Sequence, residues 1–116
     1  MENPKLNESG IPTPETLVYF EQYPEDGITE APHGVMADLK PVWAFSDRGC
    51  WKEQEEEIDG KRVVVYSIST GNWPGNELLL SCLAKTAFWG LYWESTRRGG
   101  HYKFHVPAKG YKKRKA

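Results

Sequence analysis

Hydrophobic positions gather along the chain in short runs, separated by polar stretches that contain Gly, Pro, Asn or Asp. A run of roughly four to eight residues that is rich in β-branched and aromatic side chains is typical of a β-strand. The pattern therefore predicts an antiparallel sheet of four or five strands, over residues 16–21, 42–46, 50–58, 61–69 and 101–106.

The pair Asp59-Gly60 separates two of these segments. A two-residue Asp-Gly loop favours a type I′ turn, whose twist matches that of a β-hairpin. The turn sets a register that continues outward to Trp51 opposite Ile68. Segment 50–58 is polar on both faces, whereas segment 61–69 contains a hydrophobic run suited to burial. We therefore expect the second segment to be a central strand and the Glu-rich first segment to lie at a sheet edge, where charge discourages further pairing.

The longest hydrophobic segment follows Asn76, a residue that favours the N-cap position, and runs to Gly99-Gly100, a stop signal. It predicts one helix over residues 76–97. A helix that is apolar over most of its circumference must be buried on more than one side, and one face of a small sheet cannot cover it. We therefore expect a second layer or a second subunit, with a candidate oligomer face at Leu80, Ala84, Ala87 and Leu91.

Together these elements predict an α+β fold: an antiparallel sheet of four to five strands with one long, largely buried helix packed on one face. A chain of 116 residues has the usual size of one domain. We expect an extended, partly disordered arm over residues 1–15, a domain over 16–107 and a basic flexible tail over 108–116. The predicted core comprises Leu17, Tyr19, Trp43, Phe45, Val63, Val65, Ile68, Leu79, Leu83, Phe88, Tyr92, Phe104 and Val106.

Charge is divided between the two halves of the chain. Residues 1–59 hold fourteen Asp and Glu against four Lys and Arg, a net charge of −10, and residues 60–116 hold two against eleven, a net charge of +9. Complementary surfaces of this kind steer association and set its register, and two-fold dimers are the commonest assembly. The leading hypothesis is therefore a non-enzymatic domain that forms a homodimer or binds a protein partner.

The basic C-terminal half supports an alternative hypothesis, the binding of single-stranded nucleic acid. Two observations weigh against it: the sequence pI is about 6.3, below the values typical of such modules, and Tyr102 would face away from Lys103 on a strand. The candidate contacts with an anion or a nucleic acid are Arg97, Arg98, His101, Lys103, His105, Lys112 and Lys113.

Catalytic and metal-binding patterns are weak. His101 and His105 lie about 13 Å apart on a strand, at about 3.3 Å per residue, and cannot bind one ion together. No nucleophile motif or phosphate-binding glycine pattern is recognised, so we predict no catalytic residue, no metal and no cofactor. A third hypothesis is a small-molecule-binding or enzymatic domain with an aromatic pocket, for which the candidate contacts are Trp73 and Trp93.

The remaining features concern the environment of the protein. The first residues lack the basic start and apolar stretch of a signal peptide, and no run reaches the length of a membrane span. We therefore expect a cytoplasmic protein that does not enter a membrane. Cys50 and Cys82 match no zinc pattern and are expected to be reduced and mostly buried.

Overall fold

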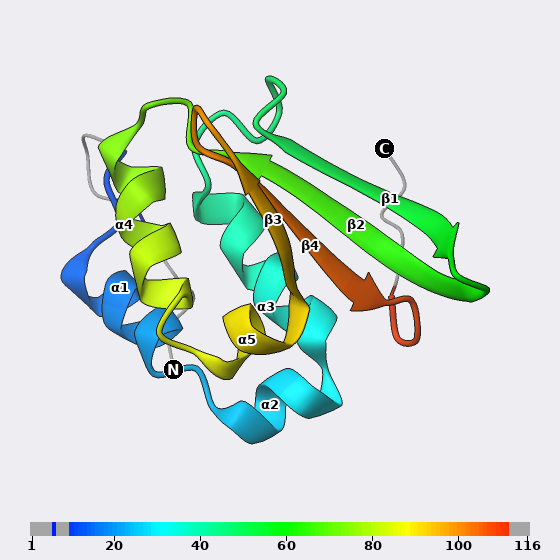
Figure 1. Cartoon of the computed structure of the whole chain (residues 1–116). Helices are drawn as coiled ribbons and strands as arrows, with labels where there is room; N and C mark the ends of the chain where they lie inside the picture. Colours follow the sequence, from blue (N-terminus) through cyan, green and yellow to red (C-terminus); the bar gives the residue numbers. More distant parts are fainter. Residues whose placement is uncertain (1–5, 7–9, 112–116) are drawn as a thin grey trace.

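The computed structural model describes Leu6 and residues 10–111. Four antiparallel strands form one sheet, and the helices lie together on one face of it (Figure 1). The strands are β1 (Trp51–Ile58), β2 (Lys61–Ser69), β3 (Trp93–Arg97) and β4 (His101–Pro107), in the spatial order β1-β2-β4-β3. The predicted α+β class and the antiparallel sheet are confirmed.

The hairpin β1–β2 has the predicted register, with Trp51 opposite Ile68. Its turn is formed by Asp59 and Gly60, whose φ angles are 52° and 79°. Positive φ at both central residues is what a type I′ turn requires. Strand β2 is central and β1 lies at an edge of the sheet, as the hydrophobic pattern predicts.

The predicted long helix is wrong, because the chain forms two short helices and a strand in its place. These are α4 (Pro74–Leu83), α5 (Ala87–Tyr92) and β3. Helix α4 ends in a tight turn, in which the Thr86 hydroxyl donates to the Leu83 carbonyl at 2.7 Å and the Thr86 backbone is extended. From Trp93 onward the chain pairs with β4, and the backbone hydrogen bonds of that pairing replace those of a helix.

The predicted strand over residues 16–21 is also wrong, since α1 (Pro14–Glu21) occupies it. The Thr13 hydroxyl accepts a hydrogen bond from the Thr16 amide at 3.2 Å, and Pro14 takes the first helical position. Thr as N-cap followed by Pro is a helix start, because the amide that Pro lacks would have had no partner in the helix.

Two more helices and a short 3₁₀ turn follow α1: α2 (Glu25–Glu30), α3 (Pro32–Leu39) and η1 (Lys40–Val42). Pro32 begins α3 in the same way that Pro14 begins α1. The predicted strand over residues 42–46 is therefore absent. The Ala44 amide instead donates to the Asn76 side chain at 2.8 Å, so a polar side chain takes the place that a neighbouring strand would have.

The core lies between the helices and one face of the sheet. Val64, Tyr66 and Ile68 of β2 are buried there, so the alternation along β2 turns Val63 and Val65 to the opposite face. Most other predicted core residues are buried or packed against the core, but Phe45 is wrong, with 42% of its surface exposed at a positive φ of 62°.

Most of the apolar surface of α4 and α5 is covered within the chain, although Leu78 and Leu91 remain 44% and 54% exposed. Helix α1 packs on α4, and α2 packs on α5 (Figure 1). Three helices that the hydrophobic pattern did not predict therefore supply the second layer, and burial of these segments does not require a second subunit.

Candidate functional site

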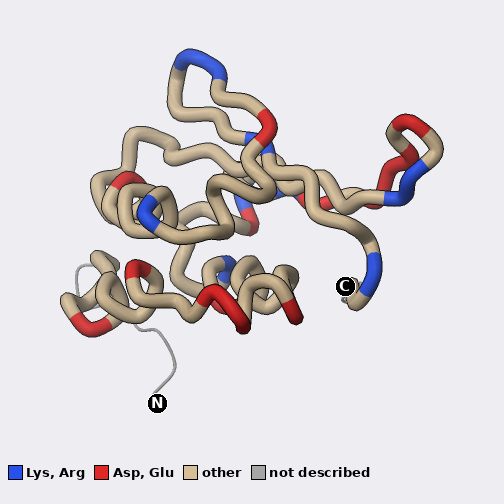
Figure 2. The backbone as a smooth tube through the Cα atoms, turned by 60° about the horizontal axis from the view of Figure 1, so that its bottom comes forward, with Lys and Arg blue, Asp and Glu red and all other residues tan. Residues whose placement is uncertain are grey.

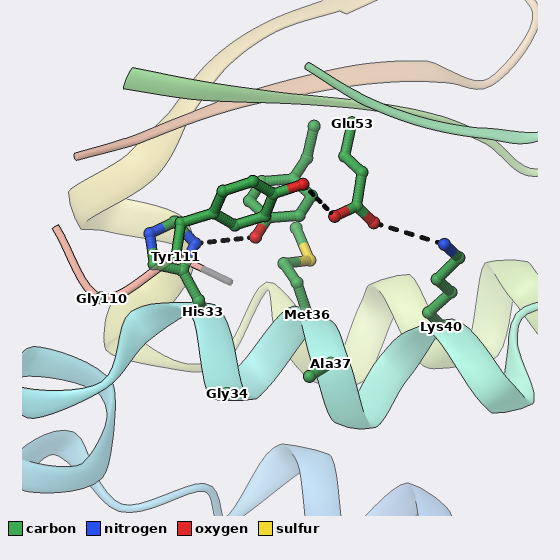
Figure 3. Close-up of a pocket in the computed structure, with 9 residues that line it drawn as sticks. His33, Gly34, Met36, Ala37, Lys40, Glu53, Gly110 and Tyr111 are labelled. Carbon is green, nitrogen blue, oxygen red and sulfur yellow. Dashed lines mark hydrogen bonds and ion pairs between the residues drawn. The ribbon is translucent and has the colours of Figure 1, made fainter. Parts of the chain in front are cut away.

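A cavity of about 310 Å³ lies between α3 and the sheet. Figure 3 shows its walls: helix α3 lies on one side, and side chains from β1 and from the segment after β4 cover the other. The lining residues are His33, Gly34, Met36, Ala37, Lys40, Glu53, Tyr66, Gly110 and Tyr111.

Helix α3 supplies one wall through the helical repeat. Residues three, four and seven positions after His33 lie on the same side of a helix as His33. The lining residues at these positions are Met36, Ala37 and Lys40. Met36 is buried against the core, whereas the Lys40 side chain at the far end keeps 35% of its surface exposed. The wall is therefore apolar in the middle and polar at both ends.

The opposite wall combines the sheet with the C-terminal segment. Glu53 and Tyr66 are direct cross-strand partners in the β1–β2 register, on the face that meets the helices. After β4 the Ala108 amide donates to the Arg62 carbonyl at 3.0 Å, and the Tyr111 amide donates to the Ala108 carbonyl at 3.0 Å. This turn brings the Tyr111 side chain back over the pocket (Figure 3).

Glu53 is the electrostatic centre of the site. Its Oε2 accepts from the Tyr111 hydroxyl at 2.6 Å, and its Oε1 accepts from Trp51 Nε1 at 2.9 Å and from Lys40 Nζ at 3.5 Å. Burial by itself raises the pKa of Glu53, but the donors on Tyr111, Trp51 and Lys40 outweigh it and hold the pKa below its ordinary value. The Glu53 side chain is therefore a carboxylate at neutral pH.

His33 links the end of β4 to the core. Its Nε2 lies 2.7 Å from the Pro107 carbonyl oxygen and its Nδ1 lies 2.7 Å from the Tyr66 hydroxyl. A carbonyl can only accept, so Nε2 carries the hydrogen, and in the neutral ring Nδ1 then accepts from the Tyr66 hydroxyl. Both nitrogens of His33 are engaged within the protein.

Both tyrosines of the pocket hold their protons firmly. Burial raises the pKa of Tyr66, and the nearby Glu53 charge raises it further. The pKa of Tyr111 is raised by burial and by its hydrogen bond to Glu53, which stabilises the protonated phenol. The Tyr111 phenol therefore donates to Glu53, and the Tyr66 phenol donates to His33 when the His33 ring is neutral.

The predicted basic residues occupy a different surface. Register pairs Arg97 with His101 and Ser67 with Lys103, which places them with His105 on the sheet face away from the helices. There His101 Nδ1 lies 2.6 Å from Ser69 Oγ, and His105 Nδ1 lies 3.8 Å from Glu94 Oε2. Arg98 follows in the β3–β4 turn, and Lys112 and Lys113 lie outside the described residues.

The residues predicted as an oligomer face and as aromatic ligand contacts do not form one site. Leu80 is buried, Ala87 is half-buried, and Ala84 and Leu91 are exposed. Trp73 packs edge-on against Phe45, with ring centroids 6.1 Å apart, and Trp93 stacks on Trp89 at the opposite end of the helical layer. None of the predicted contact residues lines the pocket.

The pocket residues themselves were not predicted as a site. The hairpin register already paired Glu53 with Tyr66, and a helix over residues 32–39 would have aligned His33 with Lys40. The sequence does not show this helix clearly, because Pro32 and Gly34 are also typical of a loop. Tyr111 had no sequence signal, since it lies in a segment of mostly Lys and Arg.

The described residues form no cluster of metal-ligating side chains, and both of their cysteines are free. Within Leu6 and residues 10–111, no three His, Cys, Asp or Glu side chains come together as ion ligands. Cys50 and Cys82 are both free, and burial raises the pKa of the Cys82 thiol. No helix among these residues is long and apolar enough to cross a bilayer.

Comparison of the chain with models of protein families, with curated protein sequences and with solved structures finds no match in any of the three.

Proposed function

We propose that this protein binds a small planar molecule in the pocket between α3 and the sheet, and that the molecule carries an anionic or hydrogen-bond-accepting group at one end. The observation that carries the proposal is a 310 Å³ cavity lined by two tyrosines, a histidine and a methionine, with a few converging polar groups. Ligand sites have this composition, and their volumes begin at about 300 Å³.

The walls favour a flat, partly apolar ligand. His33 lies 5.2 Å from Tyr111 and 5.9 Å from Tyr66 between ring centroids, so three rings surround one end of the cavity. Met36 adds a flexible, polarisable surface that adapts to a ring and makes favourable sulfur–aromatic contacts. A planar ring would contact these groups without displacing their mutual hydrogen bonds.

Lys40 indicates which polar group the proposed ligand carries. Its ammonium group has three donor hydrogens, and its contact with Glu53 is long, at 3.5 Å, on a side chain that is 35% exposed. The other polar groups of the pocket are engaged: Glu53 accepts from three donors, and both His33 nitrogens have partners. Lys40 is therefore the group best able to receive an acceptor or a carboxylate.

The protonation states of the pocket residues favour binding over catalysis. General acid–base chemistry needs a group that is within reach of the substrate and free to exchange a proton. Here the raised pKa of Tyr66 and Tyr111 and the lowered pKa of Glu53 keep each group in one protonation state near neutral pH. The arrangement is that of a rigid receptor.

Two probes of one shape test the proposal: para-hydroxybenzoate, which is anionic, and para-hydroxybenzamide, which is neutral. Saturation-transfer NMR and titration calorimetry on the full chain would measure both. We expect para-hydroxybenzoate to bind with a Kd tighter than about 1 mM, equivalent to about 4 kcal/mol. We expect the amide to bind more weakly, because it lacks the charge that Lys40 attracts.

Lys40→Gln should weaken the binding of the carboxylate roughly tenfold, about 1.4 kcal/mol, and bring its affinity to that of the amide. The matched control is Lys85→Gln, which removes an exposed lysine paired with Glu21 at 3.3 Å on the far helices. It should leave both affinities unchanged. Failure of both probes to bind, or an equal loss in the two variants, would contradict the proposal.

A further inference from the structure

Strand β3 ends the sheet with an exposed edge. It is the last strand in the order β1-β2-β4-β3, and four of its five residues are exposed. An edge strand presents backbone amides and carbonyls that can pair with a strand from another chain. Figure 1 shows β3 at the border of the sheet, with only β4 beside it in the sheet.

The two edges of the sheet differ in chemistry. Between its terminal Trp51 and Ile58, β1 consists of charged residues and one Gln, a composition that discourages pairing with another strand. The centre of β3 is Ser95-Thr96, two small neutral residues that are compatible with a ladder of backbone hydrogen bonds. Only the β3 edge is thus suited to pairing.

An apolar patch adjoins the β3 edge. Leu91 at the end of α5 is 54% exposed, and Trp93 at the start of β3 is 43% exposed. Trp93 stacks on Trp89 with centroids 6.5 Å apart and an interplanar angle of 10°, which holds the indole in place. Exposed aromatic and aliphatic side chains beside an open edge are typical of an interface.

The charges of β3 are complementary to those of a second β3 that runs in the opposite direction. Glu94 stands near the start of β3 and Arg97 at its end, followed by Arg98 in the turn. If two copies pair antiparallel, the start of each strand meets the end of the other, so Glu94 approaches Arg97 of the partner. A parallel pairing would bring like charges together, which costs stability.

We propose that two copies of this protein associate about a two-fold axis through antiparallel pairing of β3 with β3 of the partner. The two sheets become one sheet of eight strands, and Leu91 and Trp93 of each copy lie toward the end of the partner's β3, on either side of the axis. A bulge between Trp93 and Ser95 limits the regular ladder to the last residues of the strand. The interface is therefore small, and we expect dissociation in the micromolar range.

Sedimentation velocity on the full chain, from low to high micromolar concentration, tests the dimer. The wild-type protein should shift from monomer to dimer across this range. Glu94→Arg and Arg97→Glu, each alone, should weaken association at least tenfold, because like charges then face each other. The double variant restores opposite charges across the axis and should recover most of the affinity. Leu91→Ser, at an exposed site, should also weaken the dimer.

Glu56→Arg is the matched control, since it makes the same charge change on the exposed edge strand β1. It should not affect association, and thermal unfolding would verify that every variant is folded. A monomer at all concentrations would overturn the proposal. So would a dimer that is insensitive to the single reversals, or a double variant that stays as weak as the single ones. None of these outcomes depends on the ligand pocket.

Discussion

At the scale of single residues, two polar side chains organise the molecule: the half-buried Glu53 and the buried Asn76. Glu53 holds a phenol, an indole and an ammonium group around one carboxylate. Asn76 is fully buried and joins the loop before β1 to the end of β2, with hydrogen bonds to both backbone groups of Ala44 and to the Thr70 carbonyl. The prediction of Asn76 as an N-cap is wrong, since Trp73 occupies that position.

Glu53→Gln should reduce stability in a pH-dependent way. The folded state lowers the pKa of Glu53, so the charged carboxylate stabilises the fold above its unfolded pKa of about 4.3, and this contribution is lost as pH falls through the lower, folded value. Thermal or urea unfolding at neutral pH should show a loss of roughly 1 kcal/mol, and the difference from wild type should shrink in acid. A loss that does not change with pH would contradict the role of the charge.

Asn76→Ala should be the more damaging change. It removes three hydrogen bonds from a buried site and leaves the amide and the carbonyl of Ala44 without these partners, at about 1–3 kcal/mol for each such group, whereas the Thr70 carbonyl still accepts from the Trp73 amide. We expect a loss of more than about 3 kcal/mol in urea unfolding. The exposed Gln54→Ala should change stability little, and an Asn76→Ala protein as stable as that control would be inconsistent with the network.

At the scale of elements, the β1–β2 hairpin is specified locally, whereas β3 depends on its neighbour. The Asp59-Gly60 turn and the alternation of β2 already define the register of the hairpin. The hydrophobic pattern of residues 93–97 is compatible with the end of a helix. These residues form a strand because β4 offers partners for their backbone hydrogen bonds. Local signals suffice only where the turn itself constrains the backbone.

Gly60→Val tests the turn. No atom lies within 4 Å of a Cβ built at Gly60, so the cost is purely conformational and arises from its φ of 79°. We expect a loss of more than about 1 kcal/mol in thermal unfolding, because β-branched residues are strained at positive φ.

Gly90→Ala is the matched control, because Gly90 lies in α5 with no atom near its Cβ position and an ordinary helical φ. It should stabilise the protein by up to about 1 kcal/mol. Equal stability of Gly60→Val and wild type would exclude the turn assignment.

At the scale of the whole molecule, charge follows the layers. Helices α1, α2 and α3 contain six Asp and Glu and no Lys or Arg, so acidic positions follow one another along the helical side of the backbone (Figure 2). Four cations, Lys52, Lys61, Arg97 and Lys103, lie on the sheet face away from the helices. The division of charge in the sequence is therefore also, in part, a division in space.

We expect no specific binding of nucleic acid, because the sheet face with the cations carries no Trp, Tyr or Phe on which bases could stack. Removal of residues 112–116 deletes four Lys and Arg and spares Tyr111. A fluorescence titration with a short single strand should show weak, salt-sensitive binding before and after this truncation. Submicromolar affinity at physiological salt would contradict this expectation.

The sequence alone determined the α+β class, the β1–β2 hairpin with its register, and the positions of β2 and β4, since each follows from alternation or turn chemistry within a few residues. Tertiary structure decided the rest. A proline such as Pro14 or Pro32 can end a loop or begin a helix, and residues 93–97 could continue a helix or join β4. In each case the outcome depends on partners distant in the chain.

The pocket belongs to the second category, because α3, β1, β2 and the segment after β4 each contribute to it. His33 and Tyr66 are 33 positions apart, and Tyr111 and Glu53 are 58 apart. Local periodicity describes which side of an element a residue takes, but it contains no information on which sides meet. These four side chains come together at one cavity only because the helices pack against the sheet.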